Sequence, residues 1–426
     1  MKYLLAILHK LRPFFPQAIV NYGYHLPQAF LAARLYGNPG AGLEIIGVTG
    51  TDGKTTTSSL IYHILKTARK KVALVSTVDA KIGRTSIKTG FHVTSPNPFA
   101  LQAFLRRMRS QKIRYLVLEV TSHGLDQFRI YPLRPEIAVL TNITHEHLDY
   151  HGTMEAYTNA KLKLFKSAKH AVVNKDLSLF GEINARLPKV MFSTYSLHES
   201  SQLKPEAVKY SQTHTTFTLG NTLYSVPLTG EYNLYNVLAA ISTALLLGIH
   251  PSDIKRALMS FKGVKGRLES IDNKRGIHTF VDFAHTPGGL RAVLTNLHSL
   301  KKPGENLIVI FGAAGLRDDT KRPLMGTVVA ELADQIVITS EDPRIEDPGR
   351  IAKDILAGIP SSKRKKVIIE LDRAKAINLA INHLAKRRDW VVSCGKGHEE
   401  TMNLDGVTES PWSEHEVMRS ALEQKI

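Results

Sequence analysis

The residues best suited to chemistry lie in one short segment, residues 45–57, where an apolar run enters a turn rich in glycine and threonine. Backbone N–H groups in such a turn, together with the N-terminus of a following helix, favour polyphosphate. Lys54 would then reach the outer phosphates, and the Thr55 hydroxyl would lie on a magnesium ion. The strict P-loop pattern is not met, because its first glycine position holds Val48. A flexible turn without a ligand is the alternative; we predict that the segment binds a nucleotide.

Glu119 is the next candidate, because it closes the apolar run at residues 115–120. Open α/β sheets bind ligands at the carboxyl ends of their parallel strands. We therefore expect Glu119 to bind magnesium beside Thr55. The alternative is a carboxylate that faces solvent where the strand ends.

Three histidines, His145, His147 and His151, follow another apolar run at residues 137–141. This spacing can indicate zinc, but no cysteine or further histidine cluster completes a tetrahedral set. We interpret most of these histidines as part of a loop and expect no zinc.

Length and composition limit the class of protein. A chain of 426 residues predicts two or three domains, and a single cysteine, Cys394, rules out an intramolecular disulfide and fits a reducing cytoplasm. The formal net charge of +18 could indicate nucleic acid, an anionic membrane surface or acidic small substrates. The cations are spread along the chain without the aromatic-interleaved motif of nucleic-acid modules, so we expect no nucleic-acid partner.

Residues 1–40 mix aromatic side chains with cations, and no apolar run in the sequence approaches the roughly 20 residues of a transmembrane helix. We expect a short helical pair packed on the main body. The alternative is a segment that lies at a membrane surface.

Elements that would position these residues follow from hydrophobic periodicity. Strand-like runs alternate with helical patterns, which predicts an α/β fold with mostly parallel sheets. In the first half we expect strands at 43–48, 72–76, 115–120, 137–141 and 170–173, and helices at 98–109, 154–167 and 233–248. Residues 188–228, with a hairpin at Gly220-Asn221, predict an antiparallel extension. In the second half we expect strands at 278–282, 307–311, 335–339, 367–370 and 390–393, and helices at 287–299, 321–332, 348–357, 373–386 and 413–422.

Ordered motifs carry a resemblance to a known family. They include Gly-Thr-Asp-Gly-Lys-Thr-Thr at 50–56, Glu-Val-Thr-Ser-His-Gly at 119–124, Thr-Asn-Ile-Thr-His-Glu-His-Leu-Asp-Tyr-His-Gly at 141–152, Asp-Pro-Arg at 342–344 and Gly-Lys-Gly-His-Glu at 395–399. These motifs resemble those of the Mur ligases, the ATP-dependent amino-acid ligases of peptidoglycan precursor synthesis. The last two are most similar to members that add meso-diaminopimelate or L-lysine to UDP-MurNAc-L-Ala-D-Glu.

The resemblance implies a domain organisation. It implies a P-loop-type, mostly parallel ATPase domain at 43–266 and a Rossmann-like α/β C-terminal domain at 267–426. Residues 1–42 would stand in place of most of the family's UDP-binding domain, so the uridine grip would be missing, reduced or supplied by other means. It further implies a cytoplasmic enzyme, which we expect to be a monomer.

The resemblance also implies roles for single residues. Catalysis would involve Lys54, Glu119, His147, Lys161 and Arg267. ATP would be bound by Gly50, Thr51, Asp52, Gly53, Lys54, Thr55, Thr56, Asn233, Asn236, Arg267, Asp282, His285 and Lys321. Two magnesium ions would be held by Thr55, Glu119, His147 and a carbamylated Lys161. From composition alone, Lys161 would be a surface lysine of a helix.

Substrate contacts follow in the same way. The muramoyl-dipeptide would meet Thr94, Ser95, Ser122, Gln127 and Arg129, and the diamino acid would meet Arg317, Glu341, Asp342, Pro343, Arg344, Gly395 and Glu399. Glu341-Asp342 stands where the family usually has Asp-Asn. That extra carboxylate could weaken binding of a substrate carboxylate or help to bind an ammonium group.

We therefore expect meso-diaminopimelate to be favoured. The alternatives are an L-lysine-adding enzyme, a folylpolyglutamate-type or other related ligase with a non-UDP acceptor, and a basic nucleotide-binding module without ligase chemistry.

Overall fold

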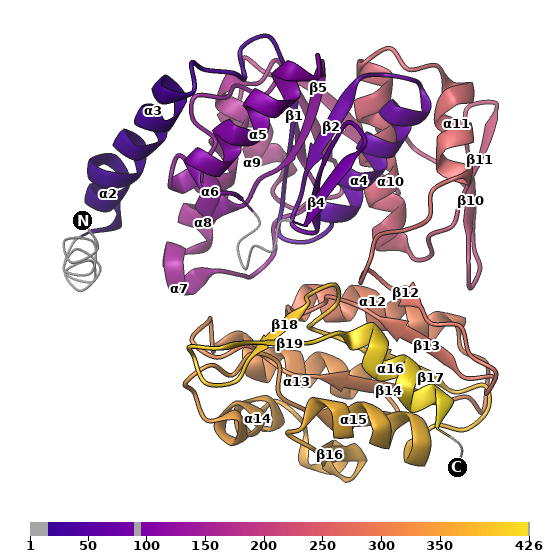
Figure 1. Cartoon of the computed structure of the whole chain (residues 1–426). Coiled ribbons are helices and arrows are strands. Elements are labelled where there is room, and N and C mark those ends of the chain that lie inside the picture. Colours follow the sequence, from indigo (N-terminus) through magenta and orange to yellow (C-terminus); the bar gives the residue numbers. More distant parts are fainter. Residues whose placement is uncertain (1–15, 89–94, 425–426) are drawn as a thin grey trace. The chain divides into compact units, whose positions relative to one another are not determined.

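The computed structural model describes residues 16–88 and 95–424, which form two compact units (Figure 1). The first unit takes its described residues from 1–142, 155–204 and 235–257, and the second from 143–154, 205–234 and 258–426. Across the described ranges, no helix combines the length and apolarity that crossing a bilayer would require.

The first unit is built on an eight-stranded sheet in the order β4-β3-β2-β5-β1-β6-β7-β8. Neighbours from β2 to β8 are parallel, whereas β3 and β4 add antiparallel strands at one edge. Strand bounds are β1 Glu44–Thr49, β2 Val72–Val75, β3 Asp79–Ile82, β4 Thr85–Lys88, β5 Tyr115–Glu119, β6 Ile137–Leu140, β7 His170–Asn174 and β8 Met191–Tyr195. The strand β5 is buried along its whole length, as expected for a parallel sheet covered on both faces.

Helices connect these strands, and two further helices, α10 and α11, follow β11 (Thr222–Val226) later in the chain. They are α4 Lys54–Thr67, α5 Pro98–Ser110, α6 Ser122–Asp126, α8 Met154–Leu162, the 3₁₀ turn η3 Phe165–Ser167, α9 Phe180–Arg186, α10 Glu231–Leu246 and α11 Pro251–Met259. The helix α4 begins after Gly53, whose φ of +80° lets the chain turn from the loop into the helix. Leu60, Ile61, Ile64 and Leu65 recur at helical spacing and are buried, and α4 packs on β1, β2 and β5.

The described part of the N-terminal segment is one continuous helical stretch. It consists of α2 Gln17–Val20, a π-helical turn η2 Asn21–His25 and α3 Leu26–Leu35. Asn21 Nδ2 donates to Asp126 Oδ2 at 2.6 Å, and the Tyr22 and Phe128 rings meet edge to face at 5.2 Å. With α3 also on α5, the described stretch packs on the first unit, as expected, whereas residues 1–15 of the expected helical pair lie outside the described residues.

The second unit contains a six-stranded sheet in the order β12-β13-β17-β14-β15-β16, parallel except for β12. Its strands are β12 Glu269–Ser270, β13 His278–Val281, β14 Leu307–Phe311, β15 Gln335–Ile338, β16 Val367–Ile369 and β17 Trp390–Ser393. Along β14 the side chains alternate between two apolar clusters, Val309 and Phe311 in one and Ile308 and Ile310 in the other. The sheet therefore separates two cores, one on each face.

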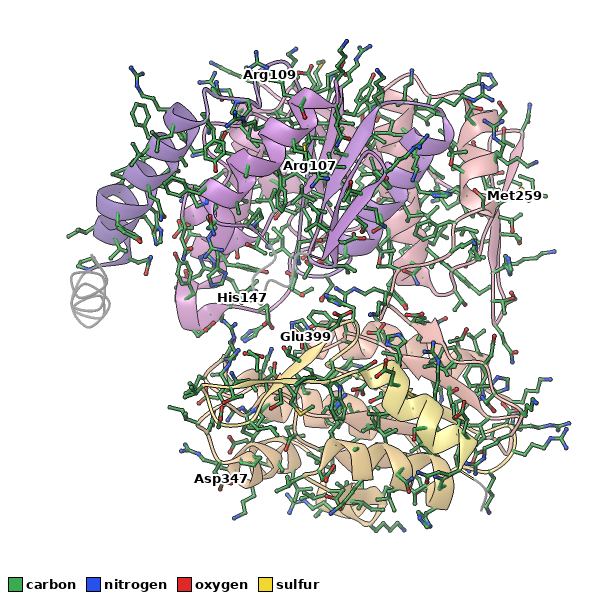
Figure 2. The ribbon with its side chains drawn as sticks, in the orientation of Figure 1. Arg107, Arg109, His147, Met259, Asp347 and Glu399 are labelled. Atoms are coloured by element: carbon green, nitrogen blue, oxygen red, sulfur yellow. The ribbon has the colours of Figure 1, made fainter. Side chains whose placement is uncertain are left out.

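Its helices are α7 Leu148–His151, α12 Pro287–Leu300, α13 Lys321–Leu332, α14 Pro348–Ala357, the 3₁₀ turn η4 Ser361–Lys366, α15 Arg373–Leu379, the π turn η5 Ala380–Leu384 and α16 Glu414–Glu423. Asp347 accepts from the Gly349 N–H and so caps α14 (Figure 2). Two small antiparallel sheets complete the unit, β9 Glu206–Tyr210 with β10 Thr215–Leu219 and β11 Thr222–Val226, and the hairpin β18 Thr401–Asn403 with β19 Glu409–Pro411.

The predicted α/β class with parallel sheets is confirmed, and so is the hairpin at Gly220-Asn221. The predicted start of the antiparallel extension at 188 is wrong, because β8 pairs parallel with β7 and the extension begins only at β9. The helix predicted at 154–167 ends at Leu162, and the one predicted at 373–386 changes to a π turn after Leu379.

Candidate active site

The glycine- and threonine-rich turn lies between β1 and α4 and is fixed by the residues that follow β6. Asn142 Oδ1 accepts hydrogen bonds from the N–H groups of Thr51 and Asp52 at 3.0 and 2.8 Å. Thr141 Oγ1 donates to the Asp52 carbonyl at 2.6 Å. Gly50 is required here, since its φ is +154° and a Cβ would lie 1.8 Å from Thr141 Oγ1. The loop is thus held in one conformation by contacts with the neighbouring strand end.

The start of α4 is tied to α10 in the first unit. Asn236 Oδ1 accepts from Thr57 Oγ1 at 3.2 Å, and a Cβ on Gly53 would lie 2.2 Å from that same oxygen. Lys54 Nζ donates to the Thr51 carbonyl at 2.6 Å, so its ammonium lies over the loop. Thr56, in the first turn of α4, is buried.

Glu119 lies beside Thr55, as predicted from its place at the end of β5. Thr55 Oγ1 donates to Glu119 Oε1 at 3.0 Å, and Thr77 donates to both carboxylate oxygens, through Oγ1 at 2.9 Å and its N–H at 3.0 Å. Glu119 is 1% exposed, so the alternative of a solvent-facing carboxylate is wrong. A hydroxyl and a carboxylate therefore offer adjacent oxygen ligands next to the loop.

Lys161 lies under the same loop. Its Nζ donates to the Gly50 carbonyl at 2.7 Å and lies 4.2 Å from the centroid of the Tyr157 ring. Thr51 Oγ1 and the Tyr157 hydroxyl are 3.1 Å apart, which joins the α8 residues to the loop. The interpretation of Lys161 as a surface lysine is wrong: it is 1% exposed, because this face of α8 is turned to the interior.

A second group of residues in the first unit surrounds Ser95. Arg129 Nη1 donates to the Ser95 carbonyl at 2.9 Å, and its Nε and Nη2 donate to Gln127 Oε1 at 3.0 and 2.6 Å. Ser122 is buried at the start of α6. Four of the five residues predicted for the acceptor thus lie close together, at Ser95 and at the two ends of α6, whereas Thr94 falls outside the described residues.

In the second unit, Asp282 orders the turn after β13. Its two carboxylate oxygens accept backbone N–H groups at 2.6 and 2.7 Å. The Arg267 guanidinium lies 4.3 Å from the centroid of the Phe283 ring, and His285 Nδ1 lies 2.8 Å from the Phe283 carbonyl oxygen. Two of these three predicted ATP-binding residues, Asp282 and His285, therefore lie in one turn, and the third, Arg267, packs against it from the segment before β12.

Two further predicted residues of this unit, Lys321 and His147, lie near Glu146, and Asn233 lies apart from them at the start of α10. Lys321 Nζ donates to Glu146 Oε1 at 3.1 Å, and both side chains are 6% exposed. His147 Nδ1 lies 4.0 Å from the same oxygen. Asn233 Nδ2 donates to the Thr229 carbonyl at 3.0 Å.

Most residues predicted for the diamino acid gather around Lys396. Its buried ammonium lies 2.9 Å from Asp342 Oδ1 and 2.6 Å from Glu399 Oε2. Burial alone would lower the pKa of Lys396, but the two carboxylates raise it above its ordinary value. Asp342 Oδ1 also accepts from the Asn403 N–H at 3.0 Å, and Arg344 Nη1 donates to the Gly315 carbonyl at 2.7 Å. Glu399 lies in the segment between β17 and β18 (Figure 2).

Glu341 is buried next to Gly395 in the same group of residues. Its burial raises the pKa of the carboxyl to about 7, against the attraction of Arg373, Lys321 and Lys396. A Cβ on Gly395 would lie 2.5 Å from Glu341 Oε2, so glycine is needed for this close approach. Pro343 follows on the same loop, whereas Arg317 lies exposed on the loop after β14.

A fully buried ion pair supports both loops of this site. Arg373 Nη2 lies 2.8 Å from Glu414 Oε1, and neither side chain is exposed. Arg373 also donates through Nη1 to the Ser340 carbonyl at 3.2 Å and through Nη2 to the Cys394 carbonyl at 2.8 Å. One guanidinium thus joins the residue before Glu341 to the residue before Gly395.

Sequence reasoning missed several residues that hold the candidate site. Lys396 and Asn142 stood inside quoted motifs and could have been singled out there. Thr77 and the Arg373–Glu414 pair carry no local signal, because their partners lie 42 and 41 residues away along the chain.

Comparison with known proteins gives the family. The Mur ligase middle domain matches residues 48–244, and the Mur ligase glutamate ligase domain matches residues 266–397. A relative from Syntrophomonas wolfei, UDP-N-acetylmuramoyl-L-alanyl-D-glutamate–2,6-diaminopimelate ligase, is 38% identical over 87% of this chain and 76% of its own length. The chain belongs to the Mur ligase family.

Solved structures agree with this Mur ligase assignment. A structure of a UDP-N-acetylmuramoyl-L-alanyl-D-glutamate–2,6-diaminopimelate ligase is 32% identical with a TM-score of 0.62, covering 93% of this chain and 82% of that one. Folylpolyglutamate synthase of Mycobacterium tuberculosis is 17% identical with a TM-score of 0.68, covering 94% and 96%. The latter shows a shared fold alone. This Mur ligase is an ATP-dependent ligase, and the resemblance found in its motifs is confirmed.

The first unit of this Mur ligase fits a nucleotide with magnesium. Gly50 and Gly53 keep the loop free of side chains where a Cβ would collide with its neighbours. Within residues 16–88 and 95–424 no group of three or more His, Cys, Asp or Glu is arranged to hold a metal. Magnesium needs no such group, because it keeps several waters and uses one or two carboxylates with substrate phosphates. Thr55 and Glu119 meet that requirement.

Proposed function

We propose that this Mur ligase joins meso-diaminopimelate to UDP-MurNAc-L-Ala-D-Glu. The observation that carries the proposal is that relatives 36–40% identical over most of the chain are named for this activity. The γ-phosphoryl group of ATP would pass to an oxygen of the acceptor carboxylate, giving an acyl phosphate and ADP. The amine nitrogen would then attack the acyl carbon, lose its proton and expel phosphate, which leaves the amide.

Both steps gather negative charge, so positioning and electrostatic stabilisation should supply the catalysis. We assign the domain of residues 43–266 to the phosphates, with Lys54 neutralising charge on the outer phosphates. Thr55 and Glu119 would hold magnesium, which withdraws charge from phosphate oxygens. Asn233 and Asn236 are assigned to the adenine side, and the domain of residues 267–426 would contribute Arg267, Asp282, His285 and Lys321.

Lys161 is assigned the role of a carbamylated lysine. Its neutral amine would add to carbon dioxide, forming an N–C bond and releasing a proton, and the resulting anion would serve with His147 at a second magnesium ion. The supporting observation is that Lys161 Nζ is buried within hydrogen-bond distance of the Gly50 carbonyl. A lysine on the protein surface could not reach the Gly50 carbonyl in the nucleotide loop.

Binding of the muramoyl-dipeptide is assigned to Thr94, Ser95, Ser122, Gln127 and Arg129.

For the diamino acid we assign Arg317 and Arg344 to the distal carboxylate, which suits a guanidinium fork. Glu399 is assigned to the distal ammonium. The extra carboxylate of Asp342 does not argue against diaminopimelate, because the Lys396 ammonium compensates its charge at 2.9 Å.

Phosphate release from ATP tests the proposal. Purified protein receives magnesium, UDP-MurNAc-L-Ala-D-Glu and, in parallel, meso-diaminopimelate, L-lysine or L-glutamate. We expect release only with acceptor and meso-diaminopimelate together, and an amide product of the matching mass. If, among the three amino acids, only L-lysine supports release in the presence of the acceptor, L-lysine replaces meso-diaminopimelate in the proposal. Release with a muramoyl-dipeptide lacking UDP would replace the acceptor, and release only with a folate and L-glutamate would contradict the proposal.

A further inference from the structure

The parallel sheet of the first unit has two distinct ends. The nucleotide loop follows the carboxyl end of β1. At the opposite edge, the register aligns the first residues of neighbouring strands, for example Val72 with Tyr115 and Ile137 with His170. The segments that enter β1, β2, β5, β6, β7 and β8 therefore lie side by side, and we term them the amino edge.

Cations dominate the amino edge. Exposed lysines and arginines lie in the segments that enter these strands, in the turn between β3 and β4, and at the end of α5. They are Lys70, Lys71, Arg84, Arg107, Arg109, Lys112, Arg114, Arg134, Lys169 and Lys189. Their segments are in direct contact. The Arg114 N–H donates to the Lys71 carbonyl at 2.9 Å, and Arg107 Nη2 donates to Thr85 Oγ1 at 2.9 Å. Arg107 and Arg109 lie on α5 (Figure 2).

Few negative charges balance these cations. In the described segments that enter the parallel strands, the carboxylates are Glu44 and Glu136, and each is engaged by a cation, Arg114 at 2.7 Å and Lys169 at 2.8 Å. Helix dipoles favour cations at helix C-termini, which accounts for Arg107 and Arg109. They do not account for Arg84, Arg134 or Lys189, which lie outside helices. The amino edge is therefore a positive surface remote from the nucleotide loop.

Large apolar side chains adjoin this surface on α3. The helix buries small residues, Ala29, Ala32 and Ala33, and leaves Leu31 and Leu35 exposed at 51% and 68%. This is the reverse of the usual pattern for a helix that packs on a core. The chain leaves α3 towards β1, and a Cβ on Gly40 would lie 2.5 Å from Leu133, the neighbour of Arg134. The chain thus reaches the amino edge five residues after Leu35, and α3 itself packs on α5, which carries Arg107 and Arg109.

We propose that the amino edge, with the exposed end of α3, binds the surface of an anionic lipid membrane. Charge complementarity selects an anionic partner, since cations near a negatively charged leaflet are attracted within a Debye length. Exposed Leu31 and Leu35 distinguish a membrane from nucleic acid, because aliphatic side chains beside a basic surface can enter the lipid interface. The nucleotide loop follows the opposite, carboxyl end of the sheet, so the proposed membrane surface does not overlap it. The proposal is independent of which amino acid the enzyme adds.

Vesicle co-sedimentation of the full chain tests the proposal. One set of vesicles contains about 30 mol% phosphatidylglycerol in phosphatidylcholine, and the other only phosphatidylcholine. We expect binding to the anionic set alone, weakened more than tenfold by Lys70→Glu with Lys71→Glu and Arg134→Glu. The matched control reverses three exposed cations of the second unit, Lys302→Glu, Lys353→Glu and Lys365→Glu, and should retain binding. Leu31→Ser with Leu35→Ser should weaken binding severalfold at unchanged charge.

The outcomes separate membrane binding from its alternatives. Wild-type protein that stays in the supernatant with both vesicle sets overturns the proposal, and so does equal loss in the edge variant and its matched control. Binding of a 30-base-pair duplex DNA without binding of anionic vesicles would assign the surface to nucleic acid instead. Unchanged ATP-dependent phosphate release and an unchanged melting temperature show that each variant remains folded.

Discussion

Replacing Lys396 with methionine tests the charge arrangement that we assign to the diamino acid. The Lys396 ammonium has no exposed surface and lies 2.9 Å from Asp342 and 2.6 Å from Glu399. Methionine keeps much of the apolar volume but removes the charge, so that Asp342 loses its cation in the interior. Breaking a buried pair from one side destabilises a protein by about 3–5 kcal/mol. Because Asp342 keeps the hydrogen bond from the Asn403 N–H, we expect the lower end, about 3 kcal/mol.

Urea unfolding at neutral pH measures this free energy, and steady-state kinetics measure the site. Adding Asp342→Asn to Lys396→Met removes the uncompensated carboxylate and should recover at least about 1.5 kcal/mol; this recovery plus the cost of Asp342→Asn alone is the coupling between the two positions. Asp342→Asn alone should be mild, since Lys396 keeps Glu399. In Lys396→Met we expect KM for the diamino acid to rise more than tenfold and KM for ATP to change little. If Lys396→Met unfolds within about 0.5 kcal/mol of wild type, or the second substitution recovers nothing, the reasoning is refuted.

Three further predictions follow from single contacts. Gly50→Ala should raise KM for ATP more than tenfold, because its Cβ would lie 1.8 Å from Thr141 Oγ1. The control Gly42→Ala, also at positive φ but in open space, should leave this KM unchanged. Equal KM values for the two variants would count against the loop geometry. Glu341 has a raised pKa of about 7, so its stabilising contribution is complete below its ordinary value of 4.5 and is lost as pH rises to 7. Wild type should therefore lose about 3 kcal/mol of unfolding free energy across that window relative to Glu341→Gln, and parallel pH profiles in urea titrations would contradict this. Lys161→Ala should abolish phosphate release and regain part of it with added short carboxylates, and full activity without them would exclude the carbamate role.

Much of the fold was predictable because parallel strands are short apolar runs between amphipathic helices. The strands β14 and β17 and the helices α13 and α14 occur at the predicted residues. The strands β3 and β4 were not predicted, because their residues are polar on one side and pair at the sheet edge. The hairpin β18–β19 was missed for a different reason: its strands are three residues long and carry too little periodicity.

The candidate site was predictable only as far as motifs reach. Glu119 could be placed beside Thr55 from the rule that ligands bind at the carboxyl ends of strands. The burial of Lys161 could not be predicted, because nothing in the periodicity of α8 identifies a lysine that points inward. The hydrogen bond from Lys396 to Asp342 joins residues that are 54 positions apart in the sequence, and only the folded sheet brings their two loops together.

The Arg373–Glu414 pair has a consequence for how the second unit meets a ligand. Arg373 holds the carbonyls of Ser340 and Cys394, so the two loops that carry Asp342 and Lys396 share one anchor. Loops anchored together lose their conformational entropy once, when the chain folds, instead of at each encounter with an amino acid. Selectivity in such a site should come from fixed charges that reject a mismatched side chain, since little rearrangement is left to accommodate one.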